Sequence, residues 1–308
     1  MTIDFLQRFT GQANLLPGPT APLSANPAVE RPLSLQLLLA GPVAIDPKRL
    51  TDWMRAVSPE TTDTRTELAP EPVDGKVIGM VGWGPHLVKL IAVNEPFSTD
   101  LLEFCLQPAH FSAELKAITR RHQTHLLLYY GGWHEDPLEQ YVALSAVAAH
   151  WNDAGGLTLL NAAARAAFPA PALTPPPDEP SLDLLEYLRS IPIPMLYGGF
   201  VKMEIEQIEG VWMRTWGNHL LELPNLAMHT AGHHHGQDTF NLFNGLLEYL
   251  RQSGNKFDAG HTMQVGDELF LRVRYPNESE WFLHSDGELF VLEEIEPSEA
   301  NVPRPKTD

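Results

Sequence analysis

The sequence predicts an α+β protein of two lobes. An N-terminal ferredoxin-like (split βαβ) sandwich is followed by a C-terminal mixed α/β lobe with an antiparallel sheet. The chain has 308 residues, 44% of them hydrophobic and 9% aromatic, which is enough for two domains with their own cores. Residues 33–168 carry patterns in the order strand, helix, two strands, helix, strand. Residues 169–180 hold six prolines in twelve positions, which predicts a stiff, extended break between the lobes.

These patterns divide the chain into five parts. Residues 1–32 are predicted to be a flexible, Pro-rich arm, and residues 33–168 the N-terminal α+β lobe. Residues 169–180 form the linker and residues 181–292 the C-terminal α+β lobe. Residues 293–308 are predicted to be a loose acidic tail.

The elements of the first lobe have clear start and stop signals. The apolar run LSLQLLLAG predicts a strand ended by Gly-Pro, and Asp46-Pro47 predicts the cap and first residue of a helix. KVIGMVGW and HLVKLIAVN read as a hairpin around Gly82–Pro85. Two helical pieces broken at Pro108 lead to the buried-type strand THLLLYYGG. Asp136-Pro137 opens a strongly periodic helix, which precedes the short strand GLTLLN.

The second lobe reads as a capped helix, SLDLLEYLRSI, followed by a hairpin that turns at Glu209-Gly210 and a strand, LELPNLAMH. DTFNLFNGLLEYLRQSG predicts a helix that ends at Gly254. HTMQVGDELFLRVRY and EWFLHSDGELFVLEEI predict the remaining strands of an antiparallel sheet.

Charge is unevenly distributed along the chain, whose net charge is −18. Residues 1–168 carry 12 Lys and Arg against 17 Asp and Glu, a net charge of −5. Residues 169–308 carry 9 against 22, a net charge of −13. Such a field repels nucleic acid and anionic membranes and attracts basic partners. The alternative is that the acidic surface serves solubility.

Sequence motifs for catalysis are not found. The single cysteine, Cys105, lies in an apolar run and reads as a core residue, and no disulfide can form within the chain. The sequence has no G-x-S-x-G elbow, no phosphate-binding loop and no HExxH. No secretory signal and no apolar run long enough to cross a bilayer are visible, so we expect a cytoplasmic protein that is not an enzyme.

The stretch MHTAGHHHGQD is the strongest candidate for a metal site. His229, His233, His235 and Asp238 offer the imidazole and carboxylate ligands that zinc takes in proteins. The flanking glycines favour a loop, and consecutive histidines on an extended chain point to alternating sides. The other interpretation is therefore a polar turn between a strand and a helix, with no cofactor.

Several segments resemble the bacterial domain-of-unknown-function family numbered forty-two sixty-one. They are RHQTHLLLYYGG, DPLEQYVALSAVAAHW and VWMRTWGNHLLELPNLAMHT, within a resemblance that covers roughly residues 33–290. This chain departs from the family pattern at Asn225, where an acidic residue is expected after Leu223-Pro224. The resemblance implies no catalytic residues. Some members resemble immunity partners of secreted antibacterial toxins, including those of type VI secretion systems.

Together these features predict an immunity protein that binds a basic toxin, such as a nuclease, through an acidic surface on the second lobe. The alternatives are a metal-binding protein or metal-dependent enzyme using the histidine-rich stretch, and an accessory or adaptor protein of a secretion machine. The residues predicted to contact the partner are acidic or aromatic: Glu204, Glu206, Glu209, Glu222, Glu278, Glu280 and Trp281.

Overall fold

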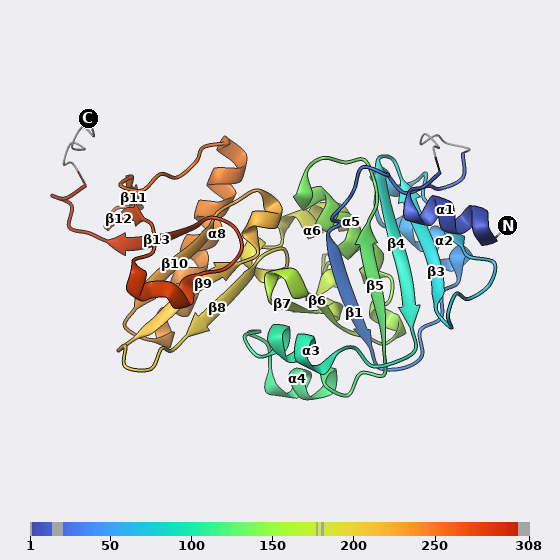
Figure 1. Cartoon of the computed structure of the whole chain (residues 1–308), viewed down its shortest axis with the longest axis horizontal. Helices are drawn as coiled ribbons and strands as arrows, with labels where there is room; N and C mark the ends of the chain where they lie inside the picture. Colours follow the sequence, from blue (N-terminus) through green and yellow to red (C-terminus); the bar gives the residue numbers. More distant parts are fainter. Residues whose placement is uncertain (1, 14–20, 177, 180–181, 301–308) are drawn as a thin grey trace. The chain divides into compact units, whose positions relative to one another are not determined.

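The computed structural model of the chain describes residues 2–13, 21–176, 178–179 and 182–300 (Figure 1). It divides into two compact units, residues 1–191 and residues 192–308, each with its own sheet. The two-lobed α+β fold class predicted from the sequence is confirmed. Among the described residues, no helix combines the length and the apolar character needed to span a membrane.

The first unit is built on a seven-stranded sheet in which every pair is antiparallel, in the order β2-β3-β4-β5-β1-β6-β7. Its strands are β1 (Ser34–Leu39), β2 (Arg65–Leu68), β3 (Val77–Trp83), β4 (His86–Val93), β5 (Thr124–Tyr130), β6 (Gly156–Asn161) and β7 (Ala166–Pro169). Its longer helices are α1 (Thr2–Thr10), α2 (Pro47–Val57), α3 (Thr99–Leu106), α4 (Ala113–Thr119), α5 (Pro137–Ala149) and α6 (Leu184–Ser190).

A ferredoxin-like core lies at the centre of this sheet. The run β6-β1-β5-β4 has the strand order of a split βαβ fold, with α2 following β1 and α5 connecting β5 to β6. The predicted hairpin does form, between β3 and β4, but only β4 belongs to this core. Strands β3 and β2 extend the sheet beyond β4, and β7 extends it beyond β6.

Both faces of the sheet are covered around β1. Leu37, Leu38 and Leu39 are all buried although successive side chains point to opposite faces. Leu38 packs with Cys105 and other residues of α3, while α5 packs against β1, β4 and β5. Burial raises the pKa of the Cys105 thiol to about 12, which fits the core role that the sequence predicts.

The described part of residues 1–32 is folded, contrary to the flexible arm predicted from its prolines. Helix α1 places Phe5 in a core cluster with Met80 and Leu87. The Nη1 atom of Arg8 lies 2.6 Å from Glu67 Oε2, which anchors the helix to β2. These contacts are with residues far along the chain, so local composition does not reveal them. Residues 14–20, the centre of the Pro-rich stretch, lie outside the described residues.

The boundary between the units also differs from the predicted linker. Within residues 169–180, Pro169 ends β7, and the 3-10 helix η4 (Ala170–Leu173) buries Ala170 and Leu173. Helix α6 was predicted to open the second lobe but belongs to the first unit. Its Arg189 donates hydrogen bonds to Glu60 at 2.7 Å and to Glu139 at 2.9 Å. Residues 177 and 180–181 lie outside the described residues.

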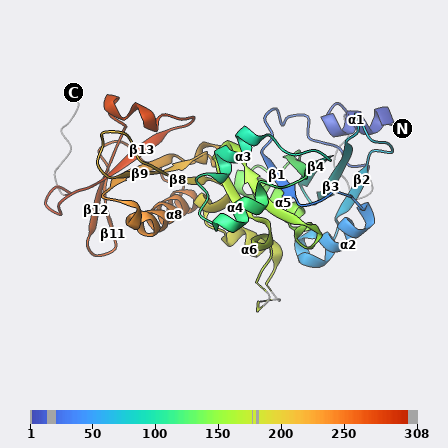
Figure 2. The same cartoon turned by 90° about the horizontal axis from the view of Figure 1, so that it is seen from below.

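The second unit is built on a six-stranded sheet in the order β11-β12-β13-β10-β9-β8, antiparallel except for the pair β10 and β13. The strands are β8 (Gly199–Met203), β9 (Val211–Trp216), β10 (Asn225–Thr230), β11 (Thr262–Val265), β12 (Leu269–Arg274) and β13 (Leu289–Glu294). Helices α7 (Ile193–Leu196) and α8 (Gly236–Ser253) and the 3-10 helix η7 (Glu278–Leu283) complete the unit. Figure 2 shows α8 and η7 on opposite sides of the sheet.

The predicted loose tail is partly strand. Glu293 and Glu294 end β13, and the Ile295 backbone N–H donates to the Phe270 carbonyl. Residues 301–308 lie outside the described residues.

A test of the first unit's packing is Gly132→Ala. A Cβ atom at this position would lie 2.6 Å from the Pro85 carbonyl oxygen and 2.7 Å from the Leu87 backbone nitrogen. Because backbone atoms cannot move aside cheaply, we expect a loss of about 3 kcal/mol in the free energy of unfolding, measured by urea denaturation. Gly245→Ala, in helix α8 with nothing within 4 Å of the added Cβ, is the control and should gain about 1 kcal/mol. Equal stability of the two variants would contradict this account.

Candidate functional site

A groove of about 610 Å³ lies on the face of the second sheet that η7 covers. Strands β9, β10, β12 and β13 form its floor, and η7, the turn between β8 and β9, and the segment after β13 form its walls. The lining residues are Ile208, Trp212, Met228, His229, Arg272, Arg274, Ser279, Glu280, Val291, Leu292, Glu293, Glu294, Ile295 and Glu299.

Strand register brings the side chains of the floor together. Trp212 is directly opposite His229 in the β9–β10 pair. Arg272 is opposite Glu293, and Arg274 is opposite Val291, in the β12–β13 pair. Because alternate residues of a strand share one face, these side chains all lie on the η7 side of the sheet.

The ion pair between Arg274 and Glu280 attaches η7 to β12. Arg274 Nη1 and Nη2 lie 2.6 and 2.7 Å from the two Glu280 carboxylate oxygens, and Arg274 Nε lies 2.5 Å from Glu293. Glu280 is only 8% exposed and also accepts a hydrogen bond from the Asn277 backbone N–H. Burial alone would raise the pKa of Glu280, but the hydrogen bonds from Arg274 and Asn277 outweigh it and hold the pKa below its usual value.

The remaining charged groups of the groove are less tightly paired. Arg272 Nη2 lies 3.6 Å from Glu299 Oε1, longer than a hydrogen bond. Glu294, at the end of β13, has no ion-pair partner among the described residues. Four glutamates against two arginines leave the lining net acidic, but Glu294 lies opposite Leu271, so its side chain is on the α8 side of the sheet. Glu299 Oε2 accepts a hydrogen bond from the Glu296 backbone N–H at 3.1 Å.

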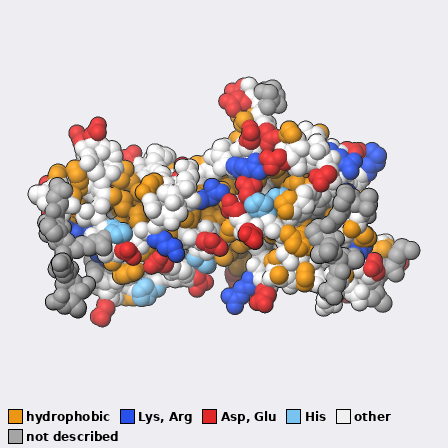
Figure 3. Space-filling model, turned by 90° about the horizontal axis from the view of Figure 1, so that it is seen from above, with side chains coloured by type: hydrophobic (Ala, Val, Ile, Leu, Met, Phe, Trp, Pro, Cys, Tyr) orange, Lys and Arg blue, Asp and Glu red, His pale blue; other side chains and the backbone are white. Residues whose placement is uncertain are grey.

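Aromatic side chains form the apolar part of this site. Trp212 is 6% exposed, and its ring lies 5.2 Å from that of His229 and 5.8 Å from that of Phe282. Its buried Nε1–H has no acceptor among the described residues. Ile208, which lines the groove, is 40% exposed, and Trp281, which follows the groove-lining Glu280 on η7, is 70% exposed. Acidic side chains lie among apolar ones on the face of the molecule shown in Figure 3.

The residues predicted to contact a partner are only partly brought together. Glu280 lines the groove, and Glu278 and Trp281 lie on the same short helix, η7. Glu204, Glu206 and Glu209 precede β9, and the Glu209 carbonyl oxygen lies 2.8 Å from His229 Nε2, which donates to it. Glu222 is outside the groove lining.

Sequence reasoning missed Trp212 as a floor residue together with both arginines, Glu293, Glu294 and Glu299. The alternation Leu-Arg-Val-Arg in β12 shows which side chains share a face. It does not show which strand lies alongside β12, and that pairing is what creates the site.

The predicted metal site is not formed. Among the described parts of the chain, no three His, Cys, Asp or Glu side chains are placed to hold a metal ion. His229 is engaged with the Glu209 carbonyl oxygen, and His233 Nε2 lies 2.9 Å from Glu204 Oε1. The His235 ring lies 4.0 Å from that of His234 at an interplanar angle of 42°, and Asp238 lies in the first turn of α8. The four predicted ligands are correctly placed near a strand-to-helix turn, but they point to separate partners.

The start of the 214–230 segment has a structural role beside the groove. Arg214 is fully buried and donates hydrogen bonds to the Leu283 carbonyl and to Ser285 Oγ, at the end of η7. Thr215 Oγ1 accepts from the Leu226 backbone N–H at 2.8 Å. Asn225 is fully buried, accepts from the Asn218 N–H and donates to the Asp286 carbonyl. The departure from the family pattern at Asn225 is therefore part of a hydrogen-bond network and not of a binding surface.

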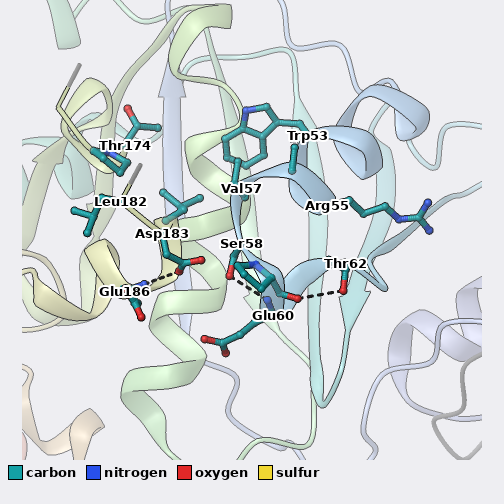
Figure 4. A pocket seen from close by; sticks show the side chains of 14 residues that line it. Trp53, Arg55, Val57, Ser58, Glu60, Thr62, Thr174, Leu182, Asp183 and Glu186 are labelled. Atoms are coloured by element: carbon teal, nitrogen blue, oxygen red, sulfur yellow. Dashed lines mark hydrogen bonds between the residues drawn. The ribbon is translucent and has the colours of Figure 1, made fainter. Parts of the chain in front are cut away.

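A second pocket, of about 980 Å³, lies in the first unit (Figure 4). Trp53 and Val57 of α2 face Leu182 and Asp183 across it, and the Arg55 side chain is directed away. Its polar groups serve their own elements, since Asp183 caps α6 and Ser58 accepts from the Glu60 N–H. The caps Asp183 and Ser58 therefore stabilise the ends of their own helices.

Two histidines of the first unit stack near the hairpin tip. The rings of His86 and His134 lie 5.0 Å apart with an interplanar angle of 11°. Tyr130 Oη accepts from the His134 backbone N–H at 3.1 Å and lies 3.4 Å from His86 Nδ1. Burial, reinforced by His134, lowers the pKa of His86 to about 4. His86 is therefore neutral at physiological pH.

Comparison with known proteins finds one family. The family described as Domain of unknown function (DUF4261) matches residues 214–282, from Arg214 into η7. The family resemblance stated from the sequence is confirmed over this part of the second unit. No curated protein and no solved structure matches the chain.

The Asn225 network can be tested with Asn225→Asp. An aspartate cannot donate to the Asp286 carbonyl, and its charge would be buried against that oxygen. We expect a loss of about 2 kcal/mol in the free energy of unfolding, measured by urea denaturation. Asn255→Asp adds the same charge at an exposed position of the same unit and should change stability little. Two equally stable variants would mean that the network tolerates an acid at Asn225.

The His86 environment predicts a dependence of stability on pH. The pKa of His86 is about 4 in the folded chain against 6.5 for a free imidazole, so the unfolded chain binds more protons below pH 6.5. Stability should therefore fall as the pH is lowered from 7 to 5, by about 2 kcal/mol from this group. The variant His86→Gln should show a shallower fall in urea denaturation at a series of pH values. His234→Gln, at an exposed histidine, should keep the full slope; an unchanged slope in His86→Gln would refute the assignment.

Proposed function

We propose that this chain is a cytoplasmic immunity protein that binds and neutralises a secreted antibacterial toxin with a basic surface, without catalysis of its own. The observation that carries the proposal is the groove of the second unit, whose lining is net acidic and includes the exposed apolar side chain of Ile208. A nuclease effector of a type VI secretion system has the basic surface that such a site would attract.

The composition of the groove suits a protein interface. Binding energy at interfaces concentrates in a few aromatic or arginine anchors surrounded by polar groups. Trp281, 70% exposed on η7 and next in sequence to the groove-lining Glu280, is the aromatic anchor, and Glu299 supplies charge in the groove. The net charge of −13 over residues 169–308 would speed the approach of a basic partner.

The state of the charged groups favours binding over catalysis. Arg274 and Glu280 are engaged with each other and hold η7 in place, so neither is positioned to transfer a proton to a ligand. The resemblance to a family with immunity-like members points in the same direction. The geometry gives no support to the alternative of a metal-dependent enzyme. The alternative of a secretion adaptor shares the binding surface and differs in its effect on the partner.

Partner capture followed by a growth assay tests this function. The full chain is used to isolate its partner from the native bacterium, and that partner is then expressed alone and together with the chain. We expect the partner to stop growth when alone and the chain to restore growth. Restored growth supports immunity. A partner that binds stably but is harmless would support the adaptor function and contradict the proposal.

The interface itself is tested with Trp281→Ala, measured by calorimetry against the isolated partner. Truncation of a central aromatic anchor should weaken the affinity at least 30-fold. Raising the salt concentration should slow association about tenfold because the attraction is electrostatic. Leu101→Ala, at an exposed apolar residue of the first unit, is the matched control and should bind normally. Normal binding by Trp281→Ala would place the interface elsewhere.

A further inference from the structure

We infer that one face of the first sheet is a docking surface for an acidic amphipathic helix of a partner protein. This surface lies in the first unit, so the inference goes beyond the proposed function, which concerns the second unit. The surface is formed by β3, β4 and β5 between α1 and α3. We call it the lysine face, and its residues are Lys76, Lys89, Ile91, Val93, Leu127 and Tyr129.

Helix α1 covers one end of this face. Phe5 of α1 packs in one cluster with Met80, which lies opposite Lys89 in the β3–β4 pair. Because directly opposite residues of an antiparallel pair share a face, α1 and Lys89 are on the same side of the sheet. The Lys89 ammonium lies over the ring of Phe9, another residue of α1, 5.5 Å from its centroid.

Helix α3 covers the other end on the same side. Leu38 packs with residues of α3 and lies opposite His125 in the β1–β5 pair. His125 in turn lies opposite Val93 in the β4–β5 pair. Val93 is four residues after Lys89 in β4, so both side chains point to the side that α1 and α3 occupy.

The middle of the face carries partly exposed apolar side chains. Ile91 lies opposite Leu127, and Tyr129 lies opposite Lys89, and all four are only partly buried. No helix is drawn across the middle of β4 and β5 on this side in Figure 1. An apolar sheet face is normally covered by another layer of structure. A helix is about 10 Å wide, which is about two strand spacings, so one helix fits over β4 and β5.

Unpaired lysines select the charge of the partner. Lys76 and Lys89 form no ion pair with any carboxylate of the described residues, including Glu95 just past the end of β4. Glu67 of β2 shares the face but is bound to Arg8. Burial lowers the pKa of Lys89, and no neighbouring carboxylate offsets this effect. A carboxylate of the partner would stabilise the charged Lys89, whereas a cationic partner would be repelled.

The spacing of the two lysines fits a helix. Lys76 directly precedes β3, and the register of the β3–β4 pair places it beside Val93. Its charge also acts on His125, which lies opposite Val93. Lys89 and Val93 are about 13 Å apart along β4. Acidic residues seven positions apart on a helix are about 11 Å apart on one face, with room between them for apolar residues that cover Ile91.

The probe is a fluorescein-labelled, alanine-rich helical peptide with two glutamates seven positions apart and two leucines between them on the same face. Its binding to the full chain is measured by fluorescence anisotropy. We expect a dissociation constant on the order of 100 μM, because a small apolar contact and two ion pairs bind weakly. The same peptide with glutamine in place of both glutamates should bind at least tenfold more weakly.

A pair of double variants assigns the binding to the lysine face. Lys76→Gln with Lys89→Gln should weaken binding of the acidic peptide at least tenfold. Lys48→Gln with Lys256→Gln removes the same charge from two other exposed positions and should leave the affinity unchanged. Lys76→Gln alone, at an exposed residue whose replacement leaves the core intact, should weaken binding severalfold. This single variant separates a loss of binding from a loss of folding.

Three outcomes would overturn the inference. The first is equal binding of the glutamate and glutamine peptides, which would remove the role of charge. The second is full binding by the Lys76 and Lys89 double variant, or an equal loss in its control. The third is tighter binding of an oligouridine RNA than of the acidic peptide, which would mean that the face recognises phosphate and not a helix.

Discussion

The attachment of η7 to the sheet is the constraint on which the second unit depends. Arg214, fully buried, donates hydrogen bonds to the Leu283 carbonyl and to Ser285 Oγ, and so fixes the C-terminal end of η7. Arg274 fixes the helix from β12 through Glu280. A buried guanidinium is stable only when its donors are satisfied, so η7 and the two arginines stabilise one another. Phe282 and Leu283 complete the attachment by packing in the cluster around Trp212. The groove exists because η7 is held over the sheet in this way.

This attachment also decides which charges a partner can meet. Glu280 and Glu293 form ion pairs with Arg274, so they hold η7 against the sheet and are less available to a partner. Glu299, which contacts Arg272 at 3.6 Å and accepts a hydrogen bond from the Glu296 N–H, is the groove-lining carboxylate that Arg274 does not bind. Acidic side chains occur on both units (Figure 3). Net charge alone can therefore accelerate association, whereas specificity requires the groove and its aromatic rim.

Local signals in the sequence predicted what depends on neighbouring residues, and missed what depends on distant ones. The Asp46 and Asp136 caps, the Gly254 helix end and the α+β class follow from short stretches of chain. The folded α1 was missed because part of the cluster that buries Phe5, including Ile78 and Met80, lies more than 70 positions away. In the site, Glu280 and Trp281 were predicted from charge and aromaticity, but Arg274 and Glu293 required the register of β12 and β13. The metal site failed for a related reason, because histidines that are close in sequence point to different partners.

The register of β12 and β13 also explains how one stretch of chain can both attach η7 and line the groove. Moving β12 by one residue would turn Arg272 and Arg274 away from η7 and replace them with Leu271 and Val273. The arginines would then face the α8 side, and Glu280 would lose its partner. The segment matched by the family contains Arg214, Arg274 and Glu280, which attach η7 to the sheet. Trp212 and Glu299, which line the groove, lie outside it. Relatives that share only the matched segment would therefore share the attachment of η7. They could still differ in what the groove binds.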